Sequence, residues 1–101
     1  MSYLNKYRMP NKTAADSPAE ELEKLKQLNT FLQRRSIALT PQELKVLYYA
    51  IQRRTNADIA TALEVSIATV KTHKNNLISK LGVAGKDGFH KFLLEMAHYR
   101  L

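Results

Sequence analysis

A set of short polar side chains with the spacing of one helix face lies in residues 67–80. At about 100° per residue, the polar and apolar residues of this segment separate onto opposite faces. The apolar face holds Val70, Leu77 and Leu81, the opposite face holds Ala68, Thr72, Asn75 and Ser79, and Lys71 and Asn76 flank the polar face. Such a helix fits the major groove of DNA, which is about 12 Å wide.

Four of these residues are candidate base contacts. Lys71 can donate to O6 and N7 of guanine, and Asn75 can pair with N6 and N7 of adenine. Thr72 can offer its methyl group to thymine or its hydroxyl to a base, and Ala68 permits close approach. Candidate phosphate ligands on the same helix are Thr69, Lys74 and Lys80, which would carry affinity rather than sequence information.

Two short helices joined by a tight turn are predicted over residues 55–81. Thr55 is the expected N-cap of the first helix, in which Ile59, Ala60 and Leu63 recur at helical spacing. The break follows at residues 64–65, and Ser66 restarts the chain as the N-cap of the polar-striped helix. Leu81 and Gly82 end that helix, because glycine readily forms a left-handed C-cap.

The rest of the chain predicts further helices and no strand. Residues 1–16 have the composition of a basic flexible arm. Capping boxes at residues 17–20 and 40–43 start two helices, the first extending to about residue 35. A last helix is expected over residues 86–99. Apolar side chains on the first and last helices are candidate dimerisation residues: Leu22, Leu25, Leu28, Leu32, Phe89, Phe92, Leu93 and Met96.

Composition favours a polyanionic partner over catalysis. The 101 residues include 16 Lys and Arg against 9 Asp and Glu, for a formal charge of +7 and a pI near 9.8. The chain has no cysteine, and His90 and His98 are too isolated to form a zinc site. No run approaches the roughly 20 apolar residues of a membrane span. We therefore expect a cytoplasmic protein that is not an enzyme, with no metal, no cofactor and no membrane contact.

Three segments also resemble the LuxR-type (GerE-like) helix-turn-helix domain of bacterial transcription regulators. They are LTPQELKVL (39–47), TNADIATALEVS (55–66) and TVKTHKNNLISKLGV (69–83), and no insertion or deletion is needed after Leu39. The chain departs from the usual pattern at Gln42 and Lys86, where the family commonly has Arg, and at Arg53, where it commonly has Gly. Because that glycine normally ends a helix in a left-handed turn, we expect the junction at Arg53 to be rebuilt or extended.

The resemblance implies roles for particular residues. It places base contacts at Lys71, Thr72 and Asn75, and phosphate contacts at Thr55 and Asn56. It further implies a homodimer on a two-fold operator, with the last helix joining the protomers.

The resulting prediction is an all-α chain: a basic arm (1–16), an amphipathic helix (17–36) and a four-helix LuxR-type domain (37–101). The predicted function is sequence-specific binding of double-stranded DNA in transcriptional regulation. The leucine-striped helix either extends the dimer interface or folds back on its own domain. Two alternatives stay open: a protein-interaction adapter or antagonist that uses this helix to bind a larger regulator, and a promoter-binding domain similar to region 4 of sigma factors.

Overall fold

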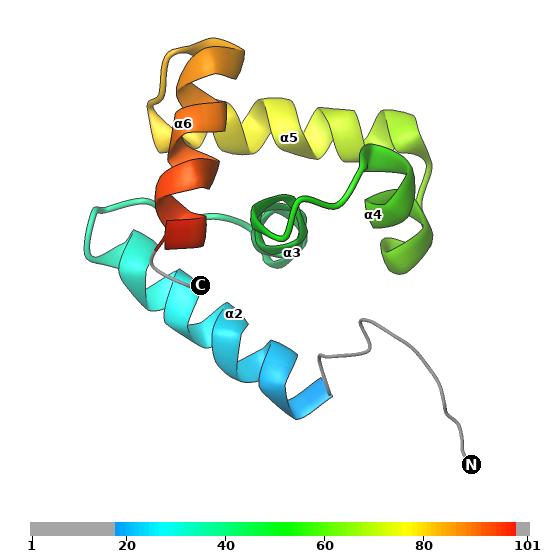
Figure 1. Ribbon diagram of the computed structural model, residues 1–101, viewed down its shortest axis with the longest axis horizontal. Helices are drawn as coiled ribbons and strands as arrows, with labels where there is room; N and C mark the ends of the chain where they lie inside the picture. The colour runs from blue at the N-terminus through cyan, green and yellow to red at the C-terminus, as the bar shows by residue number, and fades with distance from the viewer. Residues whose placement is uncertain (1–17, 99–101) are drawn as a thin grey trace.

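The computed structural model describes residues 18–98 as an all-α arrangement (Figure 1). Its helices are α2 (Pro18–Gln33), α3 (Pro41–Ile51), α4 (Asn56–Leu63), α5 (Ile67–Leu81) and α6 (Gly85–His98). The expected fold class, a helix-turn-helix domain preceded by an additional helix, is confirmed. The predicted basic arm and the predicted N-cap Ser17 lie outside the described residues.

Helix starts are set by local hydrogen bonds that the sequence predicts. Thr40 Oγ1 accepts from the Glu43 amide at 3.1 Å, and the Thr40 amide donates to Glu43 Oε1 at 2.9 Å. This is the expected capping box of α3. Thr55 caps α4 as expected, and Asp58 completes a second box there. Ser66 caps α5 by accepting from the Thr69 amide at 3.0 Å.

Helix α3 forms the centre of the molecule and contacts each of the other four described helices. In Figure 1 it is seen end-on, with α5 above it, α4 to one side and α2 below. Six consecutive residues of α3, 46–51, are buried. They include the aromatic side chains of Tyr48 and Tyr49. A helix buried on most of its circumference is a central core element.

The leucine stripe of α2 is part of this core. Leu28 and Leu32 are fully buried, Leu25 is 9% exposed, and α2 packs against α3. The Tyr49 hydroxyl also donates to Glu21 Oε1 across this contact at 3.2 Å. Side chains buried within one protomer offer no surface to a partner, so we withdraw Leu25, Leu28 and Leu32 as dimerisation residues. Leu22, 55% exposed, lies outside the core.

The junction after α3 corrects one expectation. Arg53 has φ +67°, so it adopts the left-handed conformation that glycine normally provides. The Arg53 amide donates to the Ala50 carbonyl at 3.0 Å and the Arg54 amide donates to the Tyr49 carbonyl at 3.2 Å. The helix therefore ends by the usual C-terminal hydrogen bonds, and the expected rebuilding or extension of the junction is wrong.

Candidate nucleic-acid interface

The turn between α4 and α5 sets the orientation of the polar-striped helix. Glu64 ends α4 with φ +58°, and the Val65 amide donates back to the Ala60 carbonyl at 3.0 Å. Ile59 and Ala60 are buried, and α4 packs against α5. Backbone hydrogen bonds close the turn, and both helices pack in the same core. The orientation of α5 relative to α4 and the core is therefore fixed.

Helix α5 has the two faces that its sequence predicts. Val70 and Leu77 are fully buried, whereas the side chains at the predicted base-contacting positions are all exposed. Those positions are Ala68, Lys71, Thr72 and Asn75. A helix held by its apolar face and open along a polar face has the geometry needed to enter a major groove.

Two hydroxyl groups on this helix already have hydrogen-bond partners within the first turns of α5. Thr72 Oγ1 donates to the Ala68 carbonyl at 3.1 Å, so its methyl group and lone pairs remain for a ligand. Thr69 Oγ1 lies 2.9 Å from Ser66 Oγ at the N-cap. Thr72 is therefore better suited to a methyl contact with thymine than to donating to a base.

A cavity of about 420 Å³ brings several predicted contact residues together. Asn56 at the start of α4 meets Lys71, Lys74 and Asn75 of α5 there. Lys86 at the start of α6 also lines it, and sequence reasoning did not identify this residue as a contact, although it occupies a position where the family commonly has Arg. No carboxylate is among the lining residues, so the cavity is strongly cationic.

Two observations distinguish the polar groups of this cavity. Within the described part of the chain, the buried Asn56 Oδ1 atom has no hydrogen-bond partner. Lys74 is only partly exposed, and burial lowers the pKa of its ammonium group. An anionic ligand would give the Lys74 ammonium a counter-charge, whereas the Asn56 Oδ1 atom, an acceptor, needs a hydrogen-bond donor. Leaving buried polar and charged groups unpaired is costly.

Lys80 has a different role from the one predicted. Its Nζ atom lies 2.7 Å from Glu43 Oε1, and the Glu43 side chain is only 4% exposed. Burial alone raises the pKa of Glu43, but the hydrogen bond and charge of Lys80 and the bonds from Thr40 outweigh it, so the pKa lies below the ordinary 4.5. We withdraw Lys80 as a phosphate ligand, because its charge ties the end of α5 to α3.

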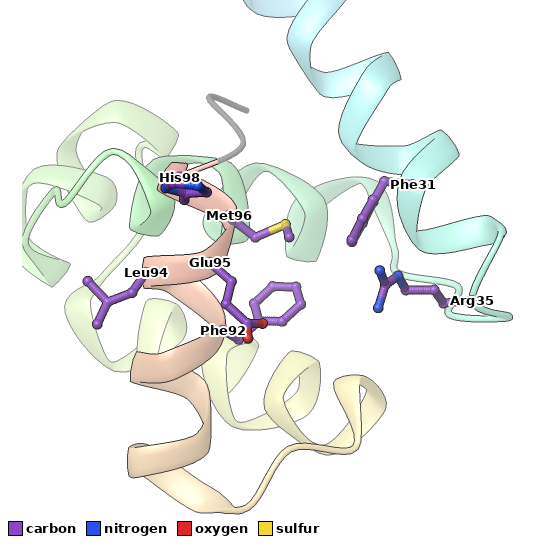
Figure 2. Close-up of a pocket in the computed structure, with 7 residues that line it drawn as sticks. All are labelled: Phe31, Arg35, Phe92, Leu94, Glu95, Met96 and His98. Atoms are coloured by element: carbon purple, nitrogen blue, oxygen red, sulfur yellow. The ribbon is translucent and has the colours of Figure 1, made fainter.

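The last helix divides its apolar residues between two sides. Phe89 and Met96 are buried in the protomer's own core, and Phe92 and Leu93 are half-buried. Figure 2 shows Phe92 and Met96 on the side of α6 that faces α2, with Leu94 pointing away on the opposite side. Leu94 is 46% exposed. Phe89 and Met96 are accordingly withdrawn as dimerisation residues, and Leu94, which the sequence analysis did not select, is added.

A groove of about 490 Å³ lies between α2 and α6, the two helices on which the dimerisation candidates were predicted (Figure 2). Phe31 and Arg35 line it from the α2 side, and Phe92 and Met96 line it from α6. The Arg35 guanidinium lies 4.2 Å from the centre of the Phe31 ring. Helix α2 thus folds back on its own domain, covering α3 more closely than α6.

Neither metal binding nor membrane insertion finds support in the described residues. Over residues 18–98, no three His, Asp or Glu side chains cluster as a metal site would require. None of the helices described there is both long enough and apolar enough to cross a membrane. The cytoplasmic location stays a prediction.

Comparison with known proteins identifies the helix-turn-helix region. Residues 37–89, over half of the chain, match the family described as bacterial regulatory proteins, luxR family. The chain is 37% identical over 57 residues to the transcriptional regulatory protein MctR of Rhizobium johnstonii, covering 56% of this chain and 27% of that protein. It is 41% identical over 49 residues to the transcriptional regulatory protein LiaR of Bacillus subtilis, covering 48% of this chain and 23% of LiaR.

A third relative is the response regulator protein VraR of Staphylococcus aureus, 42% identical over 45 residues, which cover 45% of this chain and 22% of VraR. The chain therefore matches about a quarter of the length of these curated relatives. No solved structure matches it significantly. The matches confirm the expected kind of domain and the expectation that it is not an enzyme.

Proposed function

Since the chain belongs to the luxR family of bacterial regulatory proteins and carries its DNA-binding helix-turn-helix domain, we propose that it regulates transcription by binding a specific operator. Helix α5 enters the major groove. Lys71, Thr72 and Asn75 contact base edges, and Ala68 lets the helix approach closely.

The observation that carries this proposal is the two-sided environment of α5. Its base-reading positions are exposed together, while Val70 and Leu77 on the other face are fully buried. Rigid placement matters because each good side-chain contact to a base contributes about 1 to 3 kcal/mol of discrimination only when its geometry is held. The same face adjoins a cavity lined by lysines and no carboxylate, which suits the neighbouring phosphates.

Phosphate contacts complete the proposed footprint. Thr55, Asn56, Thr69 and Lys74 retain the role expected from the sequence, and Lys86 joins them because it lines the same cavity as Asn56 and Lys74. These contacts hold the protein on the duplex whatever the bases are. Affinity should fall with salt by about 0.9 logarithmic units per phosphate contact for each tenfold rise in salt concentration.

A matched pair of asparagines tests the proposal. Asn75 and Asn76 are adjacent and both exposed, but only Asn75 lies on the base-reading face. The operator is first selected from a library of random duplexes with the whole chain. Replacing Asn75 by Ala should then reduce discrimination between the selected and a scrambled duplex by about 1 to 3 kcal/mol. Asn76→Ala should leave it nearly unchanged. Full discrimination by the Asn75 variant, measured by fluorescence anisotropy, contradicts the assigned orientation of α5.

We also propose that the operator-bound form is a homodimer joined through α6, with half-sites about 10 bp apart. The surface available for this is Leu94, together with the half-buried Phe92 and Leu93. Leu94→Glu should weaken self-association without changing the helical content, because the side chain is already 46% exposed. Sedimentation velocity at several protein concentrations measures this; an unchanged dimer places the interface elsewhere.

The two alternative functions, a protein-interaction adapter and a promoter-binding domain similar to sigma region 4, are less well supported. An adapter that binds a larger regulator through the leucine stripe of α2 needs that stripe exposed, but Leu25, Leu28 and Leu32 are buried against the chain's own domain. A promoter-binding domain similar to sigma region 4 shares the helix-turn-helix, yet the family match is to luxR regulators. A protein partner at the exposed side of α2, around Leu22, is not needed for the proposed function.

A further inference from the structure

A second, smaller cavity of about 220 Å³ lies beside the predicted contact surface. It is formed where the loop from α3 to α4 approaches the middle of α5 and the outer side of α6; Figure 1 shows this loop passing below α5 on its way to α4. Its polar lining consists of Arg53, Arg54, Thr55, Lys74 and His90, and its apolar lining of Ala50, Leu93 and Leu94. Leu93 and Leu94 form its edge on α6, so the cavity adjoins the surface proposed above for the dimer. Lys74 lines the lysine-rich cavity as well, so the two cavities adjoin at this side chain.

The backbone of Arg53 and the side chain of Arg54 are each fixed by contacts within the chain. Arg53 keeps a left-handed backbone, φ +67°, at a position where glycine would be unstrained. The Arg54 guanidinium lies 4.6 Å from the centre of the Tyr49 ring, and its Nε donates to Gln52 Oε1 at 3.0 Å. The Arg54 guanidinium is therefore stacked and hydrogen-bonded beside the cavity, next to the exposed Arg53 side chain.

The charges of this cavity are not balanced by the protein. Within residues 18–98 no carboxylate lines the cavity, and no ion pair joins Arg53, Arg54 or Lys74 to an acidic side chain. Burial lowers the pKa of Lys74, because its ammonium group loses water and gains no counter-charge. A bound anion would supply that charge and favour the protonated lysine.

We propose that this cavity binds a phosphate group of the DNA backbone, adjacent to the phosphates contacted at Thr55 and Asn56, so that the footprint extends from the α4–α5 surface to α6. Guanidinium groups suit this ligand because their planar donor fork matches two phosphate oxygens. The His90 imidazole can add a further N–H donor from α6. This inference rests on the proposed function, since it presumes that α5 lies in a major groove.

Substitution of Arg53 tests the inference because it should weaken DNA binding without lowering the stability of the fold. Arg53→Gly removes the charge and also the left-handed strain, so the variant should unfold at the same or a higher temperature than the parent chain. Its affinity for a 24-bp duplex of scrambled sequence should nevertheless fall about 3- to 10-fold at 100 mM KCl. The slope of log affinity against log salt should become less negative by about 0.9, the value for one phosphate contact.

Two further variants serve as controls. Lys26 is exposed on α2, so Lys26→Gln lowers the net charge by the same single unit away from the cavity. Its salt slope should match that of the parent chain. Arg53→Lys keeps the charge but not the donor fork, and should retain the salt slope with a smaller loss of affinity than Arg53→Gly. Fluorescence anisotropy between 50 and 300 mM KCl gives all of these values.

The outcomes separate this inference from the proposed function. If the parent chain binds with a steep salt slope and Arg53→Gly keeps both affinity and slope, the cavity does not bind DNA phosphate and the proposed function stands. If the parent chain shows no salt-dependent binding, the proposed function itself fails. Inorganic phosphate, titrated at constant ionic strength and followed by amide NMR shifts, tests a free anion as the ligand. Submillimolar phosphate binding that Arg53→Gly abolishes, without any change in duplex affinity, overturns the assignment to DNA.

Discussion

Replacing Lys80 by Met should show that the ion pair with Glu43 fastens the end of α5 to the core. Lys80 Nζ lies 2.7 Å from Glu43 Oε1, which also accepts from the Thr40 amide at 2.9 Å. Methionine keeps most of the apolar stem of lysine and removes only the charged donor. The substitution therefore leaves a nearly fully buried carboxylate without its counter-charge.

The expected loss is about 1 to 2 kcal/mol in the free energy of unfolding at pH 7. A hydrogen bond between charged groups contributes about 1.5 to 3 kcal/mol. Because the Lys80 side chain is 41% exposed, solvent screening reduces that figure. For a domain of this size the loss corresponds to a fall of about 5 to 15 °C in the melting temperature.

The loss should also depend on pH. In the parent chain the pKa of Glu43 is below 4.5, so its contribution to stability is complete above that pH and disappears as pH falls through the folded-state pKa. Without Lys80 the effect of burial remains and the pKa of Glu43 should rise. The difference in stability between variant and parent should thus shrink as pH falls below 4.5.

Urea unfolding followed by circular dichroism at pH 7 and at several values below pH 4.5 measures these differences. Glu43→Gln, which retains an acceptor for the Thr40 amide, and the double variant complete a mutant cycle with Lys80→Met. Lys26→Met, at an exposed position on α2, controls for loss of surface charge. We expect a coupling of about 1 kcal/mol. Single effects that add to within about 0.3 kcal/mol, or a loss that is independent of pH, would refute the reasoning.

Three other substitutions test the packing and the turns. Leu28→Ala should lower the free energy of unfolding by about 2 to 5 kcal/mol, equally at low and tenfold higher protein concentration, since Leu28 is fully buried within one protomer; a concentration-dependent loss would instead place it in an interface. Gly82→Ala should cost about 1 kcal/mol from φ +71° alone, because an added Cβ atom meets nothing within 4 Å. Glu64→Gly should stabilise the turn between α4 and α5 by about 0.5 to 1 kcal/mol, because Glu64 has φ +58°. Thermal melts distinguish the signs of these last two effects.

Local patterns were sufficient to predict the helices and the buried face of α5. Capping residues such as Thr40, Thr55 and Ser66 act on amides within the next three residues, so their effect depends on nearby sequence alone. The period of Val70 and Leu77 likewise defines a buried face wherever the helix is placed. The helices and the exposed position of the predicted base-contacting residues follow from such short-range rules, whereas the LuxR-type arrangement was expected from the resemblance of residues 39–83 to that family.

Relations between distant segments required the tertiary structure. Glu43 and Lys80 are 37 residues apart, and nothing local indicates that a capping carboxylate also neutralises the end of another helix. An apolar stripe on a helix indicates that the stripe will be buried, but not which surface will bury it. The α2 leucines are buried within the protomer because α3 offers an apolar surface against which they can pack. The grouping of Arg53, Lys74 and His90 around one cavity likewise arises only when three segments meet. The sequence by itself determined the helices and which face of each is apolar. Which apolar faces pack together, and which charged side chains pair across long separations in the chain, was decided by the tertiary structure, because only packing brings those segments together.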